Sequence, residues 1–146
     1  MALDDLYQDI ILEHYRQPRN RLELSDADKV IEGKNPFCGD EISVYIKIGS
    51  EVIERVTFTG KGCAISQASA SLMTEAIKGK TLDHALEIIA DFKNLTKGGS
   101  VQVEMQELMA FQGMSQFPTR IKCALLSWNT LERGLTEIAA IRSSTD

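Results

Sequence analysis

The chain has 146 residues, of which 43% are hydrophobic and 25% charged, and its formal net charge is −5. These values predict one soluble domain over residues 1–146 with a hydrophobic core of its own. The acidic balance argues against nucleic acid as a partner, because phosphates attract a basic surface. No apolar run reaches the length of a membrane span and the N-terminus lacks a secretory pattern, so we expect no membrane association.

The cysteine count bears on the compartment. The chain carries Cys38, Cys63 and Cys123. A secreted disulfide framework normally uses an even number of cysteines, so an odd number argues against one. We therefore expect thiols that are free or bound to a metal, in a cytoplasmic protein.

Apolar spacing divides the chain into strands first and helices later. Apolar residues three and four positions apart indicate helices, and alternation at every second position indicates strands. The first predicted element is a helix from Leu3 to His14, which Pro18 ends. A polar connection over 19–33, which can supply further strands, leads to a strand pair over 42–48 and 52–59 that turns at Gly49-Ser50. The later predicted elements are helices over 64–78, from Thr81 to Lys97, over 103–112 and from Thr119 onward. This order predicts an α+β fold in which helices pack on one face of an antiparallel sheet.

Each cysteine stands at the boundary of a predicted element. Cys38 comes just before a strand, Cys63 ends a Gly-Lys-Gly-Cys turn before a helix, and Cys123 is expected in the first turn of the last helix. Backbone amides and the positive end of a helix dipole stabilise a thiolate, and the neighbouring Lys61 and Lys122 add to this effect. The positions therefore suit metal ligation or nucleophilic chemistry, although a single cysteine is more often a small buried hydrophobe.

Asp40 is a fourth ligand candidate, because it lies two residues after Cys38 and Gly39 permits a tight turn between them. A purely turn-forming role explains this aspartate equally well, and the chain has no Cys-x-x-Cys motif. If Cys38, Asp40, Cys63 and Cys123 converge, three thiolates and one carboxylate suit zinc. An iron–sulfur cluster normally takes four cysteines, so this set would hold one weakly. Composition does not choose between these two.

The histidines and methionines have plainer explanations. His14 shares the apolar face of the first predicted helix and His84 belongs to a later helix, so we expect packed or surface residues rather than ligands. Met105, Met109 and Met114 are expected to belong to the core.

Three segments around the cysteines resemble the cysteine motifs of the IscU family. They read Asn-Pro-Phe-Cys-Gly-Asp over 35–40, Gly-Lys-Gly-Cys-Ala-Ile-Ser over 60–66 and Lys-Cys-Ala-Leu over 122–125. The segments Tyr-Gln-Asp at 7–9 and His-Tyr-Arg-Gln-Pro at 14–18 match as well. The resemblance covers nearly the whole chain, and it implies an IscU-like fold and a role in iron–sulfur cluster assembly.

Within this family the chain is similar to the SufU branch of Gram-positive bacteria. Lys122 stands where IscU scaffolds carry a histidine, and Phe117-Pro118-Thr119-Arg120 replaces their Leu-Pro-Pro-Val-Lys motif. Residues 97–116 form a segment that those scaffolds lack. The resemblance implies zinc on Cys38, Asp40, Cys63 and Cys123.

The same resemblance implies a mechanism. A SufS-type cysteine desulfurase docks, one of its side chains takes over a zinc position, and the freed Cys38 thiolate attacks the terminal sulfur of the desulfurase persulfide. The persulfide on Cys38 is then passed to a downstream Suf scaffold or to apo iron–sulfur proteins. Asp40 would be the easily displaced ligand. Arg120 and Lys122 would guide docking or stabilise charge near Cys123, unless they are simply solvated.

Two other functions stay open. A scaffold would assemble a transient [2Fe–2S] cluster, or hold iron, on Cys38, Cys63 and Cys123, but the absence of a histidine at Lys122 favours the sulfur acceptor. A zinc hydrolase would need a general base, and none is evident near the cysteines.

Overall fold

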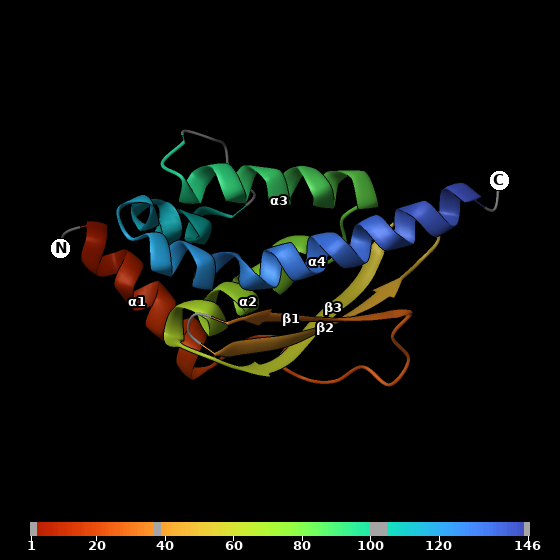
Figure 1. Cartoon of the computed structure of the whole chain (residues 1–146), viewed down its shortest axis with the longest axis horizontal. Helices are drawn as coiled ribbons and strands as arrows, with labels where there is room; N and C mark the ends of the chain where they lie inside the picture. The colour runs from red at the N-terminus through yellow and green to blue at the C-terminus, as the bar shows by residue number, and fades with distance from the viewer. Residues whose placement is uncertain (1–2, 37–38, 100–104, 145–146) are drawn as a thin grey trace.

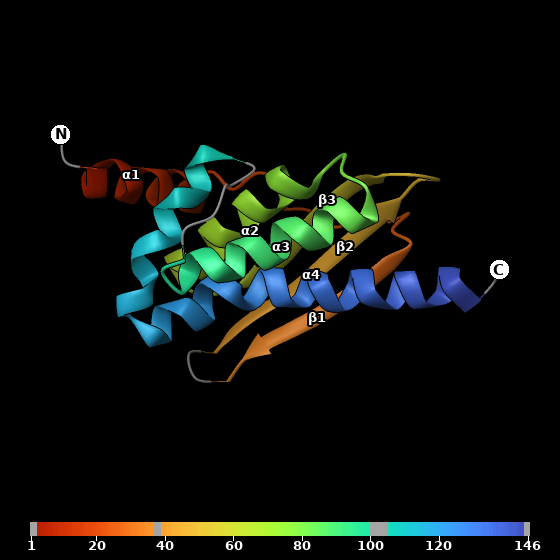
Figure 2. The same cartoon turned by 90° about the horizontal axis from the view of Figure 1, so that it is seen from above.

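Three strands and five helical segments make up the part of the chain that this computed structural model describes, residues 3–36, 39–99 and 105–144. In chain order they are α1 (Leu3–Arg16), β1 (Lys29–Asn35), β2 (Asp40–Ile48), β3 (Ile53–Lys61), α2 (Ala64–Ile77), α3 (Leu82–Thr96), the 3-10 helix η1 (Gln106–Gln116) and α4 (Pro118–Ser144). The strands form one antiparallel sheet in the order β1-β2-β3, with α2 and α4 over one face (Figures 1 and 2). The α+β prediction is confirmed. None of the helices in these ranges is long and apolar enough to cross a membrane.

The alternation read from the sequence fixes which face of β2 is buried. Ile42, Val44 and Ile46 are all at most 4% exposed and point to the helices, while the side chains between them are partly exposed. Val44 pairs with Ile31 of β1 and with Phe58 of β3. β1 comes from the polar connection, which was expected to supply a further strand.

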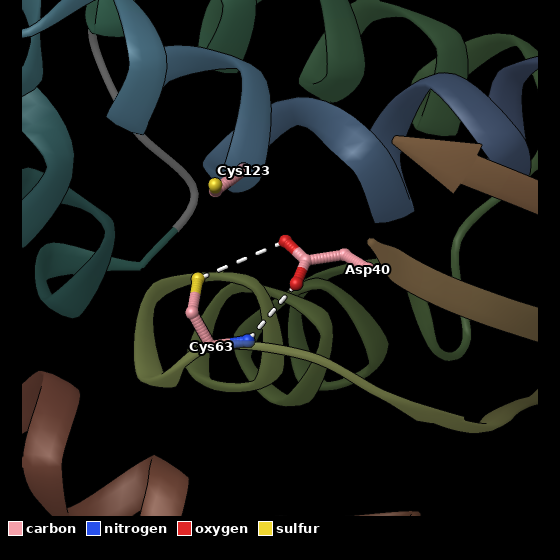
Figure 3. A group of neighbouring side chains, drawn as sticks. All are labelled: Asp40, Cys63 and Cys123. Carbon is pink, nitrogen blue, oxygen red and sulfur yellow. Dashed lines mark hydrogen bonds between the residues drawn. The ribbon is translucent and has the colours of Figure 1, made fainter. Parts of the chain in front are cut away.

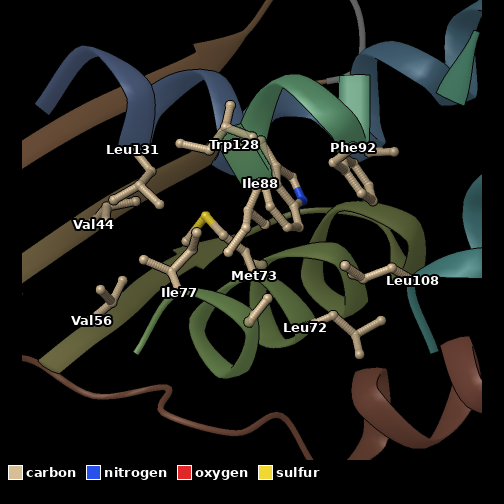
Figure 4. Packing of buried hydrophobic residues seen from close by; sticks show 14 of the residues in the cluster. Val44, Val56, Leu72, Met73, Ile77, Ile88, Phe92, Leu108, Trp128 and Leu131 are labelled. Atoms are coloured by element: carbon tan, nitrogen blue, oxygen red, sulfur yellow. The ribbon is translucent and has the colours of Figure 1, made fainter. Parts of the chain in front are cut away.

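Aromatic packing joins the helical layer (Figure 4). The rings of Phe92 in α3 and Trp128 in α4 stack with centroids 4.1 Å apart, and Phe111 of η1 meets Phe92 edge-on at 5.5 Å. The Trp128 indole donates a hydrogen bond to Ser69 Oγ on α2 at 2.9 Å, and this hydroxyl donates to the carbonyl of Ala124 at 2.6 Å. The buried polar atoms of Ser69 and Trp128 are therefore paired, and α2 is tied to the start of α4.

A glycine sets the distance between the sheet and α4. A Cβ built on Gly33 of β1 would lie 2.0 Å from Thr130 Oγ1, so only glycine allows this approach. The close contact brings the end of β1 to the first turns of α4, where Asn35 Nδ2 lies 4.0 Å from Cys123 Sγ.

The helix predicted over 103–112 was wrong in type and in its end. Residues 103 and 104 lie outside the described ranges, and the described part is η1, which continues past Gly113 to Gln116. Leu108, Phe111 and Met114 are buried at a spacing of three residues, which matches the three residues per turn of a 3-10 helix.

The expectation for the three methionines is confirmed. Met114 is buried, and Met105 and Met109 are partly buried against the core.

Buried polar contacts fasten the end of α1 to α2. His14 is 4% exposed, and its Nδ1 lies 2.8 Å from Ser71 Oγ, which also accepts a hydrogen bond from the Arg19 amide at 2.8 Å. Asn20 Nδ2 donates to Thr74 Oγ1 at 2.9 Å. His14 is thus a packed, hydrogen-bonded residue, as expected.

His14 makes the stability of the fold depend on pH. Burial lowers the pKa of His14 below its ordinary value of 6.5, and the charge of Arg19 lowers it further. Because the unfolded chain then binds the proton more tightly, the stabilisation is complete above about pH 6.5 and is lost as the pH falls toward the folded pKa.

We predict that urea unfolding shows a larger loss of stability from about pH 7.5 to about pH 5.5 for the parent than for His14→Gln. The exposed His84 provides the control, and a His84→Gln variant that flattens the profile equally would contradict this assignment.

Candidate metal site

Asp40 begins β2 and points its carboxylate inward. Asp40 follows Gly39, whose φ of +73° is the kind of backbone angle that the expected tight turn requires. Asp40 itself is 2% exposed. Oδ1 accepts a hydrogen bond from the Cys63 amide at 3.0 Å, and Cys63 Sγ lies 3.7 Å from Oδ2 (Figure 3). One carboxylate oxygen is therefore held in place while the other faces the thiol.

Cys63 is the N-cap residue of α2. Its backbone is extended, with φ −71° and ψ 170°, and its Sγ accepts a hydrogen bond from the Ser66 amide at 3.4 Å. The side chain is exposed, and it lines a cavity of about 530 Å³ between α1, α2, η1 and the start of α4. A sulfur at this position is oriented by the helix terminus and is reachable from outside.

Cys123 comes from the opposite side of the site. It is 5% exposed and lies in the second turn of α4, because the helix begins at Pro118. The prediction that placed it in the first turn was wrong: α4 begins one residue before the predicted Thr119, at a proline, which favours this position, and Cys123 is the sixth residue of the helix.

The ligand atoms of Asp40, Cys63 and Cys123 all lie within 4.8 Å of one another (Figure 3). In a tetrahedral zinc site the bond lengths place neighbouring ligand atoms roughly 3.5–3.8 Å apart, so a small inward shift would close this set on an ion. Two thiols and a carboxylate are donors that zinc accepts. Cys38 lies outside the described residues, and its place as the fourth ligand stays a prediction.

Arg120 and Lys122, the two cationic residues predicted to assist at the site, lie in different surroundings. The Arg120 guanidinium lies 4.8 Å above the Phe117 ring and lines the same cavity as Cys63. Lys122 is exposed beside the buried Cys123. His84 is on the surface, where its amide donates to the N-cap Thr81 Oγ1 at 3.2 Å.

Asn35, Gly62 and Ser66 also shape the site, and sequence reasoning did not single them out. A Cβ on Gly62 would lie 2.6 Å from Asp40 Oδ1 and 2.4 Å from Ser66 Oγ. Ser66 could have been found, because the third residue after an N-cap is the usual partner of the capping side chain. Asn35 and Gly62 act through tertiary contacts and carry no such local signal.

Comparison with known proteins identifies the family. The sequence model of the NifU-like N-terminal domain family matches residues 6–144 of this chain. The chain belongs to this family. The resemblance to the IscU/NifU-like family predicted from the cysteine motifs is thereby confirmed.

Individual relatives agree with this assignment. The NifU-like chain is 43% identical over 137 residues to the zinc-dependent sulfurtransferase SufU of Bacillus subtilis, covering 92% of each chain. It is 36% identical to the iron–sulfur cluster assembly scaffold protein IscU of Streptococcus pyogenes, covering 99% of this chain and 91% of the relative. The crystal structure of FiSufU from Fervidobacterium islandicum AW-1, titled as an iron–sulfur cluster assembly scaffold protein for the SUF system, superposes with a TM-score of 0.83 at 36% identity. It covers 92% of this chain and 99% of its own.

Gly62→Ala tests how the NifU-like fold holds its carboxylate. The new methyl group would press against Asp40, which is buried and has little room to move. We predict that zinc affinity falls about 10- to 100-fold, the usual effect of disturbing a contact that orients a ligand. Competition with a chromophoric chelator measures this. Gly49→Ala is the matched control, because the methyl group there meets only the side chain of the exposed Glu54. Equal affinities in the two variants would contradict the role of Gly62.

Proposed function

We propose that this chain is a zinc-dependent sulfur acceptor in iron–sulfur cluster assembly. The observation that carries the proposal is the convergence of Asp40, Cys63 and Cys123, from three separate elements, on one point beside an accessible cavity. The similarity to a zinc-dependent sulfurtransferase over 92% of the chain supports it.

Asp40, Cys63 and Cys123, together with Cys38, would hold the zinc. When bound, zinc keeps its thiol ligands deprotonated and fixes the order of the site. The chain's own residues orient the ligands: the Cys63 amide holds Asp40, and the Ser66 amide holds the Cys63 sulfur. Asp40 offers an oxygen donor beside the sulfur donors, and it would be the ligand most easily displaced.

Cys38 would accept the sulfur. Its thiolate attacks the terminal sulfur of the donor's persulfide, so a new S–S bond forms on Cys38 as the donor's S–S bond breaks. The electron pair of the broken bond stays on the donor cysteine, which leaves as a thiolate. The persulfide on Cys38 can be passed on in the same way.

The proposed donor is a SufS-type cysteine desulfurase, and the recipients are a downstream Suf scaffold or apo iron–sulfur proteins. Arg120 and Lys122 would assist docking or stabilise charge near the transferred sulfur. We place the protein in the cytoplasm, whose reducing conditions would keep the thiols of Cys63 and Cys123 available to a metal.

A scaffold function is the second candidate, because the Streptococcus relative is named as one. In that case Cys38, Cys63 and Cys123 would bind a transient [2Fe–2S] cluster as cargo. Lys122 cannot ligate as a cation, so the set would lack a histidine at this position.

The first test is metal content. We predict one zinc per chain in the parent, and loss of most of this zinc in Cys38→Ala, Cys63→Ala and Cys123→Ala. Each variant should also melt roughly 5–10 °C lower, because metal binding contributes to folding free energy. Elemental analysis and thermal unfolding measure both, with His84→Ala as the control. Full zinc retention in all three cysteine variants would rule out a shared site.

The second test separates acceptor from scaffold. An acceptor regenerates the desulfurase by removing its persulfide. The zinc form should therefore raise the production of alanine by the desulfurase several-fold. The metal-free protein and the Asp40→Ala variant should not raise it. Mass spectrometry of digested protein should locate the sulfur on Cys38. Equal stimulation by the metal-free form, together with a stable cluster after anaerobic reconstitution, would favour the scaffold instead.

A further inference from the structure

A second pocket lies on the other side of the Cys63 turn. It is a cavity of about 420 Å³ between the C-terminal end of α1 and the turn from β3 into α2. Three cationic side chains, those of Arg16, Arg21 and Lys61, line it together with Tyr15 and the backbone of Gly62. Its lining contains neither Arg120 nor Lys122, and none of Asp40, Cys63 and Cys123, the proposed metal ligands that the structure describes.

The charge of this pocket is opposite to that of the chain, whose net charge is −5. Arg21 is positioned by a 2.8 Å hydrogen bond to the carbonyl of Gly60. The Nζ atoms of Lys61 and Lys34 each lie 3.8 Å from a carboxylate oxygen of Glu41. One carboxylate faces two ammonium groups, so this group of three side chains keeps a net positive charge. Within the described ranges no carboxylate forms an ion pair with Arg16 or Arg21. The pocket therefore presents positive charge that the carboxylates of the described residues do not fully neutralise.

The walls of the pocket are held in place before any partner arrives. The segment that carries Arg21 is fixed by two hydrogen bonds of Asn20, from its Nδ2 to Thr74 Oγ1 and from the Phe58 amide to its carbonyl. Since these anchors lie on α2 and β3, the cations do not have to be brought together on binding. A prearranged site loses less conformational entropy when a partner docks.

The side chains indicate a protein partner. Tyr15 is 46% exposed next to the arginines, and tyrosine and arginine are the residues that most often carry binding energy in protein interfaces. A nucleic acid would also meet the acidic remainder of the surface, which repels phosphates. An acidic segment of a protein meets the cations and can cover Tyr15 as well.

The pocket is adjacent to the metal site through Gly62. This residue lines the pocket, precedes Cys63 in the chain, and packs against Asp40 on its other side. We propose that this pocket, lined by Arg16, Arg21 and Lys61, binds an acidic segment of the protein that delivers sulfur, and so places the donor's persulfide beside the metal site. This inference rests on the proposed sulfur-acceptor function.

The test removes the three charges with Arg16→Gln, Arg21→Gln and Lys61→Gln in one variant. The matched control is Arg55→Gln, Lys78→Gln and Lys97→Gln, which removes the same charge at exposed positions outside the pocket lining. The assay varies the concentration of each zinc-loaded protein and follows alanine production by a SufS-type desulfurase. A second arm measures binding of a fluorescein-labelled hexaglutamate peptide by anisotropy, which involves no sulfur chemistry.

We expect the pocket variant to need about tenfold more protein for half-maximal stimulation, the combined effect of three exposed ion pairs. A second pocket variant, Arg16→Gln with Arg21→Gln, leaves Lys61 beside Cys63 in place, and it should weaken half-saturation with the maximal rate and zinc content unchanged. The difference should shrink from about 50 mM to about 500 mM salt, because salt screens such pairs. The peptide should bind the parent and the control variant but not the pocket variant.

Equal half-saturation and peptide binding in the two triple variants would overturn the proposal. Binding of a single-stranded oligonucleotide or of phosphatidylglycerol vesicles in preference to the peptide would overturn the choice of partner. If the parent fails to stimulate the desulfurase, the acceptor function fails. Peptide binding confined to the pocket would then still establish an acidic-segment site, whose partner is not a sulfur donor.

Discussion

The hydrogen bond from the Cys63 amide to the Asp40 carboxylate is the contact on which the site depends. It joins the first residue of β2 to the residue that caps α2, and it is possible because the β2–β3 register pairs Glu41 with Lys61. A shift of this register by one residue would turn Asp40 to the other face of the sheet. The antiparallel pairing of two strands therefore determines the position of a ligand.

The third ligand is positioned by packing rather than by a strand. Ser69 Oγ accepts from Trp128 and donates to the carbonyl of Ala124, the residue next to Cys123. Gly33 lets α4 approach the sheet closely enough for Asn35 to reach the sulfur of Cys123. The depth of Cys123 thus depends on the core of the helical layer, so the metal site and the core are coupled.

Parts of the molecule could be predicted from sequence because their signals are local. Alternation in Ile42, Val44 and Ile46 identified β2, and the sequence motif around Gly39 indicated the tight turn that carries Asp40. The type of η1 was missed because residues three positions apart share a face in an α-helix as well as in a 3-10 helix. Local sequence favours an α-helix over a long 3-10 helix, which is uncommon.

The convergence of the ligands could not be derived from spacing. Cys63 and Cys123 are brought together by tertiary packing, and only the family resemblance predicted that they meet. The roles of Asn35 and Gly62 were missed for the same reason, since each acts through contacts with residues distant in sequence. The basic pocket likewise unites residues of α1, of the segment after it and of β3, with no single motif to reveal it.

The proposed function requires that cysteines from separate elements and Asp40 close on a single zinc ion. X-ray absorption at the zinc edge measures the ligands of that ion directly. We predict three sulfur atoms at about 2.3 Å and one oxygen at about 2.0 Å in the parent, with the oxygen shell altered in Asp40→Cys. A first shell of nitrogen and oxygen alone, unchanged in this variant, would contradict it.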